Sequence, residues 1–209
     1  MNTIIAICPF CRNYIKADPV TKANTHSVYS ADDVSKILKN TENKITCDRC
    51  GKEFYHEHCC RIVNAGKGYV ILSLPQISDN PPTVKAALYQ LLRKENFRFR
   101  YVREFLLLTE KVRIFEHGLD DRVIELIKYN CVPDSGDNKI ILTGIDENSM
   151  TFTVYDGYDT PLSSHRVNKD AYHTYRKELK DEIITNTTVQ WMEINLRWAE
   201  KYTKENLKP

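Results

Sequence analysis

The chain has 209 residues, of which 42% are hydrophobic and 28% charged, and these proportions are typical of a globular protein. Thirty basic and 28 acidic residues give a formal net charge of +2, and the seven glycines and eight prolines are too few for a low-complexity chain. The apolar runs are too short for a membrane helix, and the start of the chain has no basic lead of the kind a signal peptide carries, so no membrane partner is expected.

The first 75 residues hold six of the seven cysteines and are expected to form a small β module. The apolar run Ile4–Ile7 leads into the first cysteine, and residues 31–39 have the pattern of a short helix. Two β-rich runs, 54–63 and 69–74, flank a segment with two glycines and together predict a hairpin.

The clearest boundary along the chain is the segment 78–82, which ends in two prolines. Proline restricts the residue before it and is favoured in the first turn of a helix, so a new helix is expected from Pro81. Downstream, the sequence predicts an extended segment at 97–102, a helix at 105–116 ended by Gly118, and a helix capped by Asp120. A β-hairpin of 139–145 with 149–155 and a third strand at 162–167 are expected next, followed by a helix at 172–183. The last helix is expected to open at the capping box 187–190 and to turn Val189, Met192, Leu196 and Ala199 inward.

Two C-x-x-C pairs, Cys8 with Cys11 and Cys47 with Cys50, are the sharpest chemical signal in the sequence. A two-residue spacer lets two thiolates of one turn face the same ion, and two such turns supply four sulfurs in a tetrahedron. An odd cysteine count argues against a disulfide framework. The expected cofactor is a structural Zn²⁺, with iron as the other metal that such a site accepts and a set of buried or redox-active thiols as the alternative without metal.

The residues that follow the second pair leave two interpretations open. His56, His58 and Cys60 would share one face of a strand, opposite Cys59. They could form a second, catalytic metal site, or they could be a polar face with small core cysteines.

These patterns predict an α+β fold: a zinc-ribbon-like β module over residues 1–75, a linker at 76–80, and a domain of helices and antiparallel strands over 81–209. Six segments of the chain match motifs of a known family: Cys8–Cys11, Cys47–Gly51, Tyr101–Arg103, Thr109–Phe115, Gly118–Lys128 and Val189–Ala199. In these segments the chain resembles the bacterial CpXC domain family. It implies the same four cysteine ligands and a bacterial, cytoplasmic protein, but it implies no activity. One departure is Arg12, which stands where zinc knuckles commonly place glycine.

Two groups in the second domain are candidates for a functional role. Residues 85–113 hold eight basic and three acidic residues, and Arg98 and Arg100 would lie on one face of a strand where they could contact a nucleic-acid backbone. Glu110, Asp121 and Glu125 could converge to hold Mg²⁺ or Mn²⁺ for phosphodiester hydrolysis, or could form ordinary ion pairs.

The leading hypothesis is therefore a non-catalytic recognition protein that contacts nucleic acid or another protein. The alternative is a metal-dependent hydrolase or nuclease that uses the three carboxylates. A third interpretation is a purely structural or assembly role.

Overall fold

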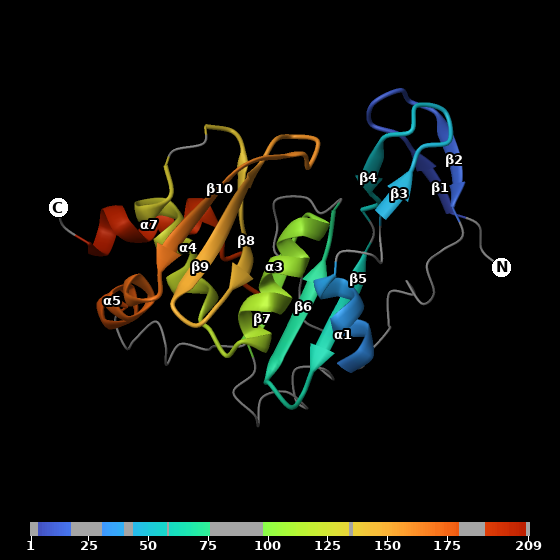
Figure 1. The fold of residues 1–209 in the computed structure, drawn as a ribbon. Coiled ribbons are helices and arrows are strands. Elements are labelled where there is room, and N and C mark those ends of the chain that lie inside the picture. Colours follow the sequence, from blue (N-terminus) through green and yellow to red (C-terminus); the bar gives the residue numbers. More distant parts are fainter. Residues whose placement is uncertain are drawn as a thin grey trace.

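The structure, a computed structural model, describes residues 4–17, 31–39, 44–57, 59–75, 98–133, 136–179 and 191–207. Within these residues the fold is α+β, with the cysteine-rich strands at one end of the molecule and two three-stranded sheets beyond them (Figure 1). None of the described helices is long and apolar enough to cross a membrane. The helix predicted from Pro81 lies outside the described residues.

The cysteine-rich end consists of two short antiparallel hairpins. In the first, β1 (Ile4–Ile7) pairs with β2 (Tyr14–Ala17), and in the second, β3 (Lys44–Thr46) pairs with β4 (Glu53–Tyr55). The single run predicted at 54–63 is therefore divided, because its first residues complete the second hairpin and its last residues enter a different sheet.

The central sheet joins β5 (Cys60–Asn64), β6 (Tyr69–Ser73) and β7 (Arg98–Val102). The predicted hairpin is present, since β5 and β6 pair antiparallel, but β7 pairs with β6 in the parallel direction. This sheet takes strands from both sides of the predicted 76–80 linker, so the linker does not separate two independent sheets. Helix α1 (Ala31–Leu38) and helix α3 (Phe105–Glu116) contact one another, and α3 packs on β6.

The second sheet is an antiparallel meander of β8 (Lys139–Ile145), β9 (Ser149–Tyr155) and β10 (Pro161–Asn168), as the alternating pattern predicts. Helix α3 lies between the two three-stranded sheets and contacts both β6 and β8 (Figure 1). Its sequence explains this position, because it buries side chains on almost all sides rather than on a single stripe.

Helix α4 (Asp121–Cys131) begins as predicted, with the Asp120 carboxylate accepting a hydrogen bond from the backbone N–H of Arg122. It contacts helix α5 (Asp170–Glu178) and helix α7 (Leu196–Asn206), which cover the far end of the molecule (Figure 1). The main hydrophobic core combines side chains of α1, β5, β6, α3, α4, β8, β9 and α7.

The start of the last helix differs from the prediction. Residues 187–190 lie outside the described part of the chain, and α7 starts only after Asn195, whose side chain accepts a hydrogen bond from the backbone N–H of Trp198. Met192 is not helical: its backbone N–H donates to Phe99 and its carbonyl accepts from Tyr101. Pairing with β7 satisfies two polar backbone groups that a helix end would leave open.

Candidate metal centre

The two hairpins at the cysteine-rich end have matching turns. In the first, the backbone N–H of Cys8 donates to Asn13 and its carbonyl accepts from Arg12, both at 2.9 Å. In the second, the N–H of Cys47 donates to Lys52 and its carbonyl accepts from Gly51, again at 2.9 Å. Each C-x-x-C pair therefore lies in a compact turn that directs both of its thiols to the same side.

The four predicted ligands come together at this point. The Sγ atoms of Cys8, Cys11, Cys47 and Cys50 all lie within 4.8 Å of one another. Across the two turns, Cys8 and Cys50 are separated by 3.7 Å and Cys11 and Cys47 by 3.6 Å, sulfur to sulfur. Ligands about 2.3 Å from a tetrahedral ion stand about 3.8 Å apart, so the cluster has the dimensions of a four-sulfur metal site.

The chain leaves both turns in the left-handed conformation. Gly51 has φ = 69°, which glycine adopts without steric cost, whereas Arg12 has φ = 58°, which is unfavourable for a side chain with a Cβ. Arg12 is the departure noted in the sequence, and the structure shows that the turn keeps its geometry despite it. The side chains of Asn13 and Asp48 join the two turns through a hydrogen bond of 2.6 Å.

The thiols are not equivalent in acidity. Burial raises the pKa of Cys47, but hydrogen bonds from the backbone N–H groups of Cys50 and Arg49 lower it, and its pKa falls to about 7. The backbone of Asn13 lowers the pKa of Cys11, but burial and the three neighbouring thiols raise it to about 12. Four adjacent thiolates repel one another, so a cation among them is what would let all four ionise together.

The apolar core beneath the thiols is small. It consists of Ala6, Cys8, Ile15, Cys47 and Phe54, with Phe10, Cys11 and Ile45 against it. So few apolar groups offset only part of the conformational entropy of ordering two hairpins, so an ion held by the four thiolates would add to the stability of the module.

Two sets of contacts tie this module to the remainder of the protein. The Phe10 ring lies 5.2 Å from the ring of Tyr158, in the loop between β9 and β10. On the other side, Glu57 accepts a hydrogen bond of 3.0 Å from the backbone N–H of Phe105, at the start of α3. Burial raises the pKa of Glu57 to about 7, and the nearby carboxylates of Asp159 and Glu104 add to the effect.

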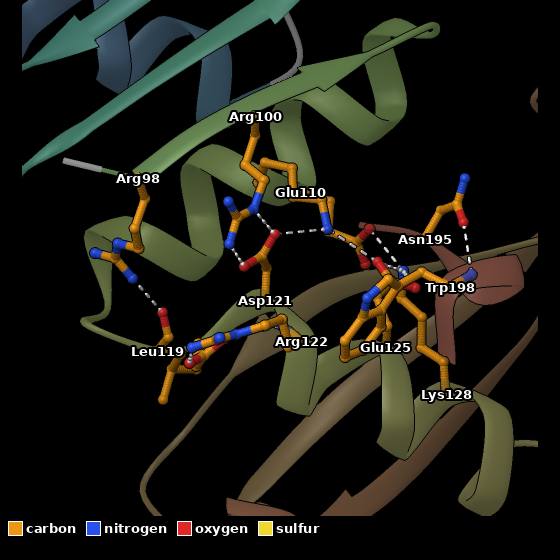
Figure 2. Close-up of polar contacts among 12 residues, drawn as sticks. Arg98, Arg100, Glu110, Leu119, Asp121, Arg122, Glu125, Lys128, Asn195 and Trp198 are labelled. Atoms are coloured by element: carbon orange, nitrogen blue, oxygen red, sulfur yellow. Dashed lines mark hydrogen bonds and ion pairs between the residues drawn. The ribbon is translucent and has the colours of Figure 1, made fainter. Parts of the chain in front are cut away.

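Glu110, Asp121 and Glu125, the carboxylates of the predicted acidic site, do converge in the core, but together with three cations (Figure 2). Asp121 accepts two hydrogen bonds from Arg100, at 2.7 and 2.9 Å. The remaining pairs are Lys111 with Asp121 at 3.3 Å, Lys111 with Glu125 at 3.1 Å, Lys128 with Glu125 at 3.1 Å and Lys128 with Glu110 at 2.7 Å.

In this network of six side chains, burial and the neighbouring cations shift the pKa values of the carboxylates in opposite directions. Burial would raise the pKa of Asp121, but Arg100 and Lys111 lower it well below its ordinary range. Burial likewise raises the pKa of Glu110, and Lys128 opposes the rise. Since each carboxylate already contacts an ammonium or guanidinium group, the cluster resembles a structural ion-pair network rather than a divalent-cation site. Among the described residues, the cysteines are the one group with metal-ligand geometry.

The structure corrects the expectation of an exposed basic face on β7. Arg100 is buried against Asp121, and Arg98 is partly buried: it donates to the Leu119 carbonyl at 2.9 Å, with its guanidinium 4.2 Å from the centre of the Phe115 ring. Both guanidinium groups thus serve the fold, and nucleic-acid contact through them stays a prediction that would require the pair with Asp121 to open.

The second metal site suggested at His56, His58 and Cys60 includes one residue, His58, that is not among the described residues. Cys60 is buried in the main core, as the structural interpretation expected, and Cys59 is exposed.

An exposed apolar face on the first hairpin was missed at the level of sequence. Ile5, Ile7 and Tyr14 are 63%, 54% and 72% exposed, while Ala6 and Ile15 between them are buried. Ile7 lies opposite Tyr14 and Ile5 opposite Lys16, so the four side chains share one face. The available signal was the two-residue period of a strand: if Cys8 faces the other cysteines, then Ala6 lies on its side of the strand and Ile5 and Ile7 lie on the opposite side.

Comparison with known proteins gives one match. A family model described as CpXC protein matches residues 6–128, which is more than half of the chain and includes all four clustered cysteines. A search of curated proteins and a search of solved structures each give no match.

Proposed function

The chain belongs to the CpXC protein family, and from that premise we propose that it is a non-catalytic recognition protein whose cysteine module is held together by a structural zinc ion. The observation that carries this proposal is the closed four-sulfur cluster. Four thiolates complete the tetrahedral shell of Zn²⁺ and leave no position for water or substrate, which is the pattern of structural rather than catalytic zinc.

A reducing compartment fits the same proposal. None of the seven cysteines forms a disulfide bond in the structure. Zinc-bound thiolates persist where disulfides do not form, so we place the protein in a bacterial cytoplasm, as the family resemblance implies.

The surface we assign to recognition is the exposed face of Ile5, Ile7, Tyr14 and Lys16 on the metal-bound hairpin. An exposed aromatic ring between aliphatic and cationic side chains is the chemistry that stacks a base and contacts the adjoining phosphate. Arg12, Lys16, Arg49 and Lys52 are exposed on the same module. These features favour a single-stranded nucleic acid over a protein partner, although a protein could also use the isoleucines.

Elemental analysis of protein purified without added metal tests the zinc assignment. One zinc per chain is expected in the wild type and much less than one in the variant Cys47→Ser, whose remaining three sulfurs bind more weakly. Cys131→Ser, at an exposed cysteine outside the cluster, is the matched control and should keep its metal. Iron in place of zinc, or full zinc in Cys47→Ser, would contradict the proposal.

Fluorescence anisotropy with a labelled single-stranded oligonucleotide tests the recognition surface. Tyr14→Ala should weaken binding about tenfold, because one base stack is worth about 1–3 kcal/mol. Tyr129→Ala, at a tyrosine that is exposed on α4, is the matched control. Equal loss in both variants, or the absence of binding by zinc-loaded wild type, would refute the nucleic-acid version and leave a protein partner to be sought.

A further inference from the structure

A second feature, remote from the cysteines, has the form of a small-molecule site. A pocket of about 760 Å³ lies where the end of β7, the start of β8, α4 and α7 meet. Cavities that hold small organic ligands are usually about 300–1,000 Å³. The pocket lies at the Lys128 end of the buried ion-pair network: Glu125, Lys128, Asn195 and Trp198, all labelled in Figure 2, are in its wall.

Three aromatic side chains are among the residues that line the pocket. The chain has two tryptophans, Trp191 and Trp198, and both line the pocket together with Tyr101. Trp191 packs edge-on against Phe99, and its buried indole N–H has no hydrogen-bond acceptor among the described residues. The nitrogen atom itself is not accessible to solvent, so a ligand in the pocket would contact the ring carbons of Trp191 rather than this N–H.

The charges that line the pocket are not balanced. Five basic and three acidic side chains contribute to the wall, a surplus of two positive charges. Several of the cations are already engaged, as in the pair of Arg103 with Glu193 at 3.1 Å. Arg197 and Lys201 differ, because they lie one turn apart on α7, both exposed at the rim. Lys201 is 4.0 Å from Glu205, and no ion pair to Arg197 is found within the described residues.

We propose that this pocket binds a nucleoside monophosphate, with the base against the tryptophan wall and the phosphate at Arg197 and Lys201. A phosphate monoester carries a charge of about −1.5 to −2 near neutral pH, and Arg197 and Lys201 place two exposed cations one helical turn apart to receive it. A flat ring suits the aromatic side chains that line the pocket, because it can stack on them. This site is independent of the exposed hairpin face, so each can fail without the other.

Because no tryptophan lies elsewhere in the chain, indole resonances report on this pocket alone. Protein labelled with ¹⁵N at the indole nitrogens is titrated with adenosine, guanosine, cytidine and uridine 5′-monophosphates, and separately with adenosine and inorganic phosphate. Both indole signals are expected to shift and saturate with at least one monophosphate, and to need about tenfold more adenosine or phosphate, since each then lacks one set of contacts. Unmoved indole signals with all four monophosphates at millimolar concentration overturn the proposal, as does an equal response to phosphate alone.

Charge reversal at the rim distinguishes a specific site from general attraction. Arg197→Glu and Lys201→Glu should each weaken binding about tenfold, the effect of one lost charge-assisted hydrogen bond, while the backbone amide spectrum stays folded. Lys177→Glu, at an exposed position on α5 outside the pocket, makes the same change in net charge as Lys201→Glu. An equal loss in Lys177→Glu, or unchanged affinity in both rim variants, overturns the proposal.

Discussion

Replacing Asp121 by asparagine tests whether the buried ion-pair network stabilises the fold. Asp121 is fully buried and contacts two cations, Arg100 at 2.7 Å and Lys111 at 3.3 Å. The network holds three cations and three carboxylates, so Asp121→Asn leaves one positive charge uncompensated in the core. Breaking a buried pair from one side typically costs about 3–5 kcal/mol. Asparagine retains a carbonyl oxygen that can accept from Arg100, so we expect the lower end, about 3 kcal/mol.

Urea unfolding followed by circular dichroism measures this loss directly. Since the pKa of Asp121 lies below its ordinary 3.8 in the folded state, its stabilising effect is complete above about pH 5 and is lost as the pH falls through the folded-state pKa. The free energy of unfolding of wild type should therefore exceed that of Asp121→Asn by the same amount at pH 7 and pH 5.5, and by less in more acidic solution.

A surface pair provides the control for this experiment. Glu200 contacts Lys204 at 2.6 Å on α7, and both side chains are about half exposed or more. Glu200→Gln should lower the free energy of unfolding by less than about 1 kcal/mol, because exposed ion pairs contribute little to stability. If Asp121→Asn costs no more than Glu200→Gln, the inference that the network stabilises the core is refuted. The double variant Arg100→Met with Asp121→Leu should recover most of the loss, because it removes both charges.

Two further predictions concern a carboxylate and a turn. The free energy of unfolding of Glu57→Gln should exceed that of wild type by up to about 3 kcal/mol at pH 8 and should be nearly equal to it at pH 4. The reason is that a folded-state pKa raised from 4.5 to about 7 makes the stability of wild type fall as the pH rises across that range. An identical difference at both pH values in urea unfolding would contradict this. Gly118→Ala should lower the free energy of unfolding by about 1 kcal/mol, because Gly118 has φ = 69°, which is unfavourable for alanine even though an added Cβ meets nothing within 4 Å. Gly157 has no positive φ, so Gly157→Ala should leave stability in thermal unfolding nearly unchanged.

Local patterns determined several parts of this protein correctly. The C-x-x-C spacing predicted the four cysteines that cluster, because a tight turn brings its own residues together whatever the remainder of the chain does. The same holds for the N-cap of α4 by Asp120 and for the β8–β9 hairpin, whose signals lie within a few residues of the structures they predict.

Side-chain partners were decided only by the tertiary structure. Helical spacing placed Asp121 and Glu125 on one face of α4, and alternation placed Arg100 on one face of β7, but neither pattern says what the opposite element presents. The parallel pairing of β6 with β7 turns Arg100 toward the core, where it meets Asp121, and so a predicted binding arginine becomes part of a buried ion pair.

The pocket likewise depends on contacts between distant segments that local sequence patterns do not predict. The last helix was predicted to run through residues 191 and 192, but Met192 instead pairs with β7, and Trp191 lines the pocket together with Trp198. Periodicity reports which residues of one element share a face. It carries no information on contacts between elements distant in sequence, because those depend on how the core packs, and it is there that both the ion-pair network and the pocket arise.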